Sequence, residues 1–312
     1  MTHLKQLQQF FESSDISLLT DSTELARYAR DQAIDARLIN QQVQMPANSV
    51  CITLSRAGTD ALLRLAARCP SGRTMYTQAH AFDPALASAI YTLELICTSD
   101  YRQAMANQET LLELLDDHHR LQLIGPGSHG RLEISHGAAP YAMIDEDVQA
   151  AGNHFIFPLA ELLEVHYTHM NPEEPRTFRL DGEFKVAGIL AARGYHDPSI
   201  PRHVIESLAH LSEQVAIHGA TAMIEGNQLR AFWVEGRDQC ALLNQATGPR
   251  ALQLTESAFG VNASIADCID YRINSQLNEG IEGMHVAVGD GRQGYHIDLL
   301  MPGITANPYG AS

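Results

Sequence analysis

The chain has 312 residues, of which 45% are hydrophobic and 19% are charged, and its formal net charge is −16. This length is sufficient for two domains or one large domain with a substantial core, and the composition is that of an ordinary globular protein. The strong negative charge excludes nucleic acid and anionic membranes as partners, because both bind basic surfaces.

The amino-terminal sequence predicts an amphipathic helix over His3–Glu12. We do not expect a signal peptide here, because the segment has neither an apolar core nor a small-residue cleavage site. No run approaches about 18 consecutive apolar residues, so no transmembrane helix is predicted. Five scattered cysteines without CxxC spacing indicate free thiols in a reducing, cytoplasmic compartment. They are Cys51, Cys69, Cys97, Cys240 and Cys268.

Strands and helices are predicted to alternate through the first 120 residues. Asp21 and Glu24 form a possible capping box for a helix that continues to Arg30. Strands are predicted for SVCITL, RTMYT, LELICT and HRLQLIG, and helices for GTDALLRLAAR and Asn107–Asp117. This alternation predicts a small, partly parallel α/β domain over residues 1–120.

Beyond Gly125 the pattern changes to short strands and turns. The predicted elements are a hairpin in GPGSHGRLEISHG, two strands about Asp181-Gly182, a helix opened by Ser199, a hairpin about Gly226-Asn227 and a short helix over Asp238–Ala246. These elements predict a second domain over residues 121–312, of mainly antiparallel α+β architecture.

Potential metal ligands lie in or beside three apolar runs near the carboxyl terminus. The runs Ala251–Leu254, Met284–Val288 and Ile297–Met301 predict buried strands. The potential ligands are Glu256, His285, His296 and Asp298. His296 and Asp298 point to one face because strand side chains repeat every two residues. Alone, that pair is equally a satisfied strand histidine beside a surface aspartate, but all four residues together predict a metal site.

The same stretch resembles a known family of enzymes. ESAFGVN at Glu256–Asn262, GMHVAVGDG at Gly283–Gly291 and HIDLLM at His296–Met301 resemble the carboxy-terminal half of the M29 (thermophilic-type) metallo-aminopeptidases. Upstream, Asn153, Pro158 and Glu161 resemble the family's Asn…Pro-x-Gly-Glu-Val block, with Ala160 in place of the glycine. The similarity extends over roughly residues 120–305.

The resemblance implies a metal-dependent hydrolase of peptide or small amide bonds. In this interpretation two divalent ions, Zn²⁺, Co²⁺ or Mn²⁺, hold a hydroxide between them as the nucleophile. The implied ligands are Glu161, Glu256, His285, His296 and Asp298. We expect Asp298 to bridge the ions, because it shares a strand face with a histidine. The family also implies a homodimer formed through the carboxy-terminal half.

Further roles are implied for residues near these ligands. Glu279 or Glu282 would ligate a metal or act as the general base, although either is equally a solvated loop carboxylate, and Tyr295 is the nearest match to a family tyrosine. His166 would contact the substrate or be a plain surface histidine. Asn153 would contact the substrate or hold the turn before Pro158.

This sequence departs from the M29 pattern at Ala160-Glu161, where the family commonly has two glutamates. One of two roles, metal ligand or catalytic base, is therefore vacant or passes to Glu164. Two other functions stay open. One follows from a more distant resemblance to the dihydroxypyridine-type ring-cleaving dioxygenases of the same fold, which would bind one Fe(II) through two histidines and one aspartate. The other is a degenerate relative that binds a peptide or small molecule in a biosynthetic pathway.

Overall fold

The computed structural model describes residues 4–69, 71–152, 154–193, 200–250 and 252–310. Asn153 and Ser199, for which roles were predicted from the sequence, lie outside these residues. Within the described ranges, no helix has the length and apolar character needed to span a membrane.

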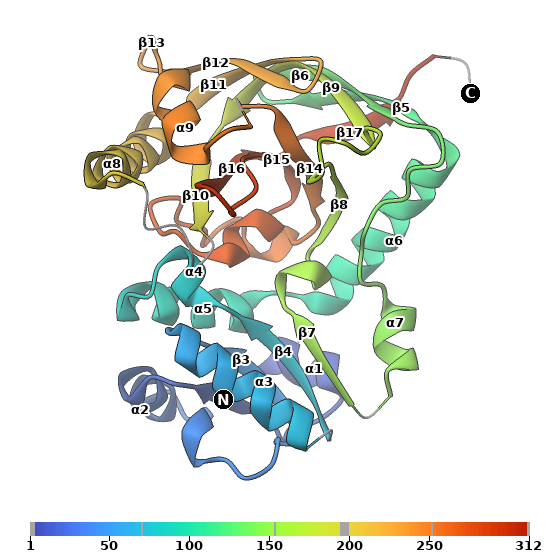
Figure 1. Ribbon diagram of the computed structural model, residues 1–312. Helices are drawn as coiled ribbons and strands as arrows, with labels where there is room; N and C mark the ends of the chain where they lie inside the picture. The colour runs from blue at the N-terminus through green and yellow to red at the C-terminus, as the bar shows by residue number, and fades with distance from the viewer. Residues whose placement is uncertain (1–3, 70, 153, 194–199, 251, 311–312) are drawn as a thin grey trace.

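The amino-terminal half is built on a five-stranded parallel sheet with the order β2-β1-β3-β4-β7 (Figure 1). Its strands are β1 (Ser17–Thr20), β2 (Asp35–Leu38), β3 (Asn48–Ile52), β4 (Gly72–Thr77) and β7 (His154–Pro158). Helix α3 (Arg56–Arg68) covers one face with Leu62 and Leu65. Helices α1 (Lys5–Phe11), α2 (Thr23–Asp31) and α5 (Leu86–Thr98) contribute apolar side chains to a second core cluster of this half, which is larger than the one that contains Leu62 and Leu65.

Two local predictions for this half are wrong. LELICT lies in helix α5 and not in a strand. This helix is apolar over most of its circumference, and periodicity alone cannot distinguish a buried helix from a buried strand. The side chain that caps α2 is Ser22, which accepts a hydrogen bond from the Leu25 amide, whereas Asp21 accepts one from the Leu54 amide.

The remaining strands form two antiparallel sheets. One has five strands in the order β10-β16-β15-β14-β8, and the other has seven in the order β13-β12-β11-β9-β6-β5-β17. The first contains β8 (Glu164–Thr168), β10 (Gly188–Arg193), β14 (Leu254–Gly260), β15 (Gly283–Val288) and β16 (Tyr295–Pro302). The second contains β5 (Arg120–Gly125), β6 (Ser128–Ile134), β9 (Phe178–Val186), β11 (Ala220–Glu225), β12 (Gln228–Val234), β13 (Arg237–Asp238) and β17 (Thr305–Pro308).

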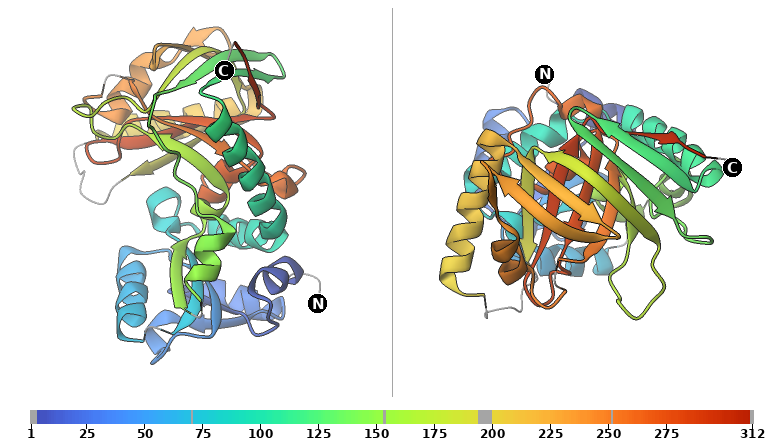
Figure 2. Two further views of the ribbon diagram at one scale, coloured as in Figure 1. Left: turned by 90° about the vertical axis from the view of Figure 1, so that its right-hand side faces the viewer. Right: turned by 90° about the horizontal axis from the view of Figure 1, so that it is seen from above.

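The two antiparallel sheets pack face to face over a shared apolar core, as the view from above shows (Figure 2). Val286 and Leu299 enter this core from the five-stranded sheet, and Leu132 and Phe184 enter it from the seven-stranded sheet. Each sheet therefore has one apolar face turned toward the other. The predicted α/β and α+β fold class is confirmed.

The hairpin predicted about Gly226-Asn227 is present between β11 and β12, and both turn residues have positive φ, of 56° and 67°. The buried Asn227 side chain also donates to the Phe178 carbonyl at 2.7 Å and accepts from the Leu180 amide at 2.6 Å. The turn predicted at Asp181-Gly182 is wrong, because β9 continues through both residues and pairs with β6 and β11.

The other helices connect the sheets or cover their margins. They are α4 (Ala79–Phe82), α6 (Tyr101–Asp117), α7 (Asp145–Ala150), α8 (Arg202–His218) and α9 (Cys240–Thr247), with short 3₁₀ turns η1 (Ile39–Gln41), η2 (Ala160–Leu162), η3 (Ala263–Ile265) and η4 (Gln276–Gly280). Helix α6 extends along one side of the molecule from the parallel sheet toward the antiparallel sheets (Figures 1 and 2). Helices α4 and α5 lie between the two halves (Figure 1).

Asn274 joins the two halves at the edge strand β10. Its side-chain oxygen accepts from the Ala191 amide at 2.9 Å, and its amide group donates to the Ala191 carbonyl at 2.9 Å. The same amide group donates to the Phe82 carbonyl of α4 at 3.0 Å. One side chain thus bonds both backbone groups of an edge residue and also the facing helix.

Candidate metal centre

The predicted ligands come together on the face of the five-stranded sheet that is turned away from the apolar core. Glu256 and Ala258 of β14, His285 and Ala287 of β15, and Asp298 of β16 share this face through strand alternation. In the register, Ala258 lies opposite both His285 and His166, and Ala287 lies opposite both Glu256 and Asp298. Two methyl-sized side chains therefore stand between the ligands in the register.

Histidines and carboxylates alternate in an unbroken row across this face. From β8 to β16 the row consists of His166, Glu164, His285, Glu256, His296 and Asp298. Successive members approach to 3.4, 3.3, 3.5, 3.8 and 3.0 Å between imidazole nitrogen and carboxylate oxygen. Every carboxylate inside the row therefore faces two imidazoles.

Two glutamates connect neighbouring histidines through different oxygens. Glu164 turns Oε1 toward His166 and Oε2 toward His285. Glu256 turns Oε1 toward His285 and Oε2 toward His296. A carboxylate with its two oxygens so placed could bridge two ions, and Glu164 and Glu256 share this arrangement, while the bridging role predicted for Asp298 stays a prediction.

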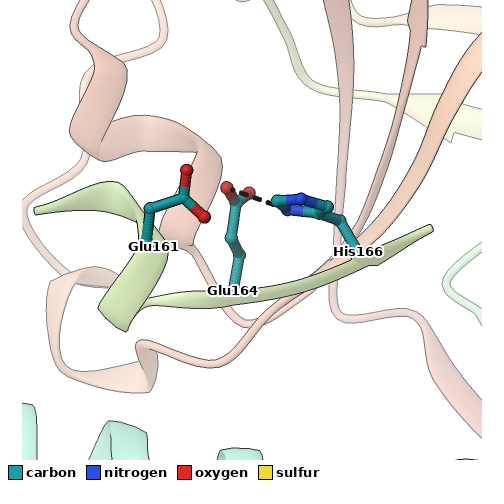
Figure 3. Close-up of side chains that lie close together, drawn as sticks. All are labelled: Glu161, Glu164 and His166. Atoms are coloured by element: carbon teal, nitrogen blue, oxygen red, sulfur yellow. Dashed lines mark ion pairs between the residues drawn. The ribbon is translucent and has the colours of Figure 1, made fainter. Parts of the chain in front are cut away.

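Glu161 extends the row at its β8 end. Its side chain comes from η2, immediately before β8, and Figure 3 shows its carboxylate directed toward that of Glu164. One ligand atom each from Glu161, Glu164 and His166 lie within 4.8 Å of one another. The same holds for Glu164, Glu256 and His285.

Several buried polar atoms in this cluster have no hydrogen-bond partner among the described residues. They are Oε2 of Glu161, Oε2 of Glu164, Nδ1 of His166 and Nδ1 of His285. Two of these atoms, Oε2 of Glu164 and Nδ1 of His166, lie within ion-pair distance of a neighbour but without hydrogen-bond geometry. Buried polar atoms rarely remain unpaired in proteins, so the cluster is incomplete without a further ligand.

Burial and like charge raise the pKa values of two carboxyl groups here. The pKa of Glu161 is raised to about 7 by burial and then by Glu164. Burial raises the pKa of Glu279 well above its usual range, and Glu164 and Asp298 raise it further. Glu256 behaves differently, because His285 and His296 outweigh its burial and lower its pKa.

Each histidine in the row has a raised pKa. Burial alone would lower these values, but Glu164 raises that of His166 to about 9, and Asp298 raises that of His296 to about 10. The pKa of His285 is raised by Glu256 and Glu164. A divalent cation would replace these protons as the balancing positive charge, which makes its binding dependent on pH.

The donor set fits divalent cations of intermediate hardness. Carboxylate oxygens and imidazole nitrogens without thiolate are typical ligands of an exchangeable Zn²⁺, Mn²⁺ or Co²⁺ ion. A closed structural zinc site would instead favour thiolates. The side chains of His285 and Asp298 are each 2% exposed, so the inner ligands are fixed by packing.

Most other site residues predicted from the sequence are placed by the structure. Glu279 is buried on η4, and the negative charges of Glu164, Asp298 and Glu256 raise its pKa. Glu282 is exposed. Tyr295 is not brought to the cluster. It faces the apolar core on the other side of β16, and the Arg193 guanidinium lies 6.0 Å from its ring centroid.

Glu164, which the sequence offered only as an alternative to Glu161 for a ligand or base role, is central in the structure. It lies nearer than Glu161 to the centre of the row, between two histidines. Glu164 and His166 have the spacing of His296 and Asp298, with one residue between two ligand types on a strand. That repeated spacing was the available signal.

Comparison with known proteins identifies a family. Residues 13–309 match the family model described as "Crocagin biosynthetic protein CgnE/B". No curated protein matches the sequence significantly. Among solved structures, the chain is similar to wild-type AmpT from Thermus thermophilus at 12% sequence identity and a TM-score of 0.48, covering 96% of this chain and 93% of that chain. The family that matches along the chain is thus not the M29 family that the motifs resemble. The chain belongs to the CgnE/B family of crocagin biosynthetic proteins.

Proposed function

We propose that the protein is a metal-dependent hydrolase that cleaves a peptide or small amide bond in a biosynthetic pathway. The observation that carries this proposal is the row of alternating histidines and carboxylates, with unpartnered buried atoms, on one sheet face. The biosynthetic context is supported by the family description.

Two divalent ions would be held by the inner part of the row. Glu164, Glu256 and His285 would hold one ion, and Glu256, His296 and Asp298 would hold the other. When bound, such a pair activates water and polarises the carbonyl group that is to be cleaved.

Proton transfer is assigned to Glu279. It is buried beside the row, and the charges of Glu164, Asp298 and Glu256 act on it, yet it belongs to neither group of mutually close ligands. A carboxyl group in that position can take a proton from water and deliver it to the leaving amine. Glu282 is exposed and does not meet this requirement.

A panel of aminoacyl-anilides and dipeptides tests the proposal. We expect turnover that EDTA abolishes and that Zn²⁺, Co²⁺ or Mn²⁺ restores. Glu256→Gln should lower kcat at least about 100-fold, since even outer partners of metal ligands contribute 10–100-fold. The control Glu173→Gln changes an exposed carboxylate and should leave kcat unchanged. No cleavage of any amide with any of these metals would refute the hydrolase.

A second candidate is a protein that binds a peptide or small molecule without cleaving it. It is favoured by the ion pairs, which already balance part of the cluster's charge in the absence of metal. Saturable binding of an amide substrate without turnover, with metal bound or removed, would identify it.

A mononuclear Fe(II) dioxygenase fits the cluster less well. Two histidines and one aspartate would satisfy a single iron, but Glu161, Glu164, Glu256 and Glu279 would then remain as a dense group of buried or half-buried carboxyl groups. Dependence of product formation on O₂, with one iron per chain, would support it against the hydrolase.

A further inference from the structure

We propose that Glu161, Glu164 and His166 form an accessory binding site for a third divalent cation, outside the inner pair. The three side chains supply two carboxylates and one imidazole, with ligand atoms that lie within 4.8 Å of one another. The site shares Glu164 with the inner pair, but its occupancy does not depend on whether the protein hydrolyses amides.

Unpartnered atoms at this end of the row indicate a missing ligand. Within the part of the chain that the structure describes, Oε2 of Glu161 and Nδ1 of His166 are buried and have no hydrogen-bond partner. The Glu164 side chain is 7% exposed, and Figure 3 shows its carboxylate between Glu161 and the His166 ring. A cation placed among them would satisfy all three groups at once.

Glu164 can serve both sites because its two oxygens approach different histidines. Oε1 lies 3.4 Å from Nδ1 of His166, and Oε2 lies 3.3 Å from Nε2 of His285. One ion can therefore bind on the His166 side while another binds on the His285 side. A carboxylate in this position could be shared by two ions, as in two-metal sites.

Tyr141 fixes the orientation of the His166 ligand. Its ring stacks on the imidazole with centroids 5.1 Å apart and planes 19° apart. The two residues also exchange backbone hydrogen bonds, from the Tyr141 amide at 2.8 Å and from the His166 amide at 3.0 Å. Tyr141 is thus a positioning residue, and because it is 50% exposed, the accessory site lies near solvent.

The accessory ion should exchange faster than the inner ions. His285 and Asp298 are each 2% exposed, whereas His166 is 12% exposed and Glu161 is only half-buried. A ligand set with more access to water releases its ion more readily. Dialysis should therefore remove the accessory ion first.

Zinc stoichiometry tests the site. Wild type and the variants Glu161→Gln and His166→Gln are saturated with Zn²⁺, freed of unbound metal, and measured by plasma mass spectrometry. We expect three ions per chain in wild type and two in each variant. The matched controls Glu173→Gln and His154→Gln alter exposed side chains and should keep three. Equal zinc content in wild type and both variants would overturn the proposal.

A second measurement avoids any dependence on variants that fold poorly. Crystals of wild type soaked in Zn²⁺ should show an anomalous peak among Glu161, Glu164 and His166. Absence of that peak, while the inner positions are occupied, would also overturn the proposal. Amide turnover, measured on the same proteins, separates the two hypotheses. An occupied accessory site without turnover would refute the hydrolase alone, and turnover without the accessory ion would refute the accessory site alone.

Discussion

At the scale of single residues, Glu279 shows the strongest effect of burial and like charge on a carboxyl group of the cluster. Its carboxyl group is buried near Glu164 and Asp298, and no ion pair with a histidine is present for it among the described contacts. The glutamates of the row are different, because each is paired with imidazoles. In the metal-free protein Glu279 is therefore the carboxyl group most strongly driven to retain its proton.

This pKa shift predicts that the metal-free protein loses stability as pH rises. The folded-state pKa of Glu279 lies well above 4.5, so above that pH the folded state binds a proton that the unfolded state has released. The stabilisation is complete below 4.5 and falls by up to about 1.4 kcal/mol per pH unit until the folded-state pKa is reached. Denaturant titrations at several pH values should show a shallower decline for Glu279→Gln. An identical slope in both proteins would contradict the assignment.

At the scale of elements, the side chain of Asn227 adds hydrogen bonds to the strand pairing that joins the hairpin β11–β12 to β9. Asn227 is fully buried, and its amide group bonds to the backbone of Phe178 and Leu180. Its own backbone conformation, with φ of 67°, is one that few residues other than glycine and asparagine adopt. Asparagine therefore fits this position for two reasons, the positive φ of its backbone and the two hydrogen bonds of its side chain.

Asn227→Gly should keep the turn and lose both side-chain hydrogen bonds. We expect a loss of about 2 kcal/mol in unfolding free energy, from about 1 kcal/mol for each bond. Gly226→Ala is the comparison for conformation alone, because nothing lies within 4 Å of the added Cβ and only the strain of φ 56° remains. Chemical denaturation measures both. A smaller loss for Asn227→Gly than for Gly226→Ala would show that the bonds contribute little.

The elements also show where sequence patterns suffice and where they fail. Alternation within the strands predicts that His296 and Asp298 share a face, and the same alternation places Tyr295 on the other one. LELICT was ambiguous because a buried helix and a buried strand are both continuously apolar. Glu164 and Glu161 are three residues apart, and only the change from η2 to β8 between them decides which lies inside the row.

At the scale of the molecule, the division of the chain at residue 120 stays a prediction, and the parallel sheet extends beyond it. Strand β7 pairs with β4. Phe155 of β7 stacks on Phe11 at 6.5 Å between ring centroids, and Val261 and Leu277 join the same core cluster. The first sheet thus obtains part of its core from the second half of the sequence.

A fragment of residues 1–120 should therefore fail to fold cooperatively by itself. It would lack an edge strand and several buried apolar side chains, and each fully buried side chain of that size contributes about 1.5–3 kcal/mol. Thermal unfolding followed by near-ultraviolet circular dichroism should give no sigmoidal transition for the fragment, in contrast to the full chain. A cooperative transition would show that this segment is an independent domain.

Asn274 has a consequence for how copies of the protein meet. By bonding both backbone groups of Ala191, its side chain takes the place of a neighbouring strand at the margin of β10. An exposed edge strand can pair with a strand of another molecule, and repeated pairing of this kind leads to aggregation. Asn274→Ala should expose this margin and produce concentration-dependent multimers, which light scattering would detect. An unchanged mass at high concentration would show that other residues shield it. The side-chain amide of Asn274 would thus prevent polymerisation through the edge of β10.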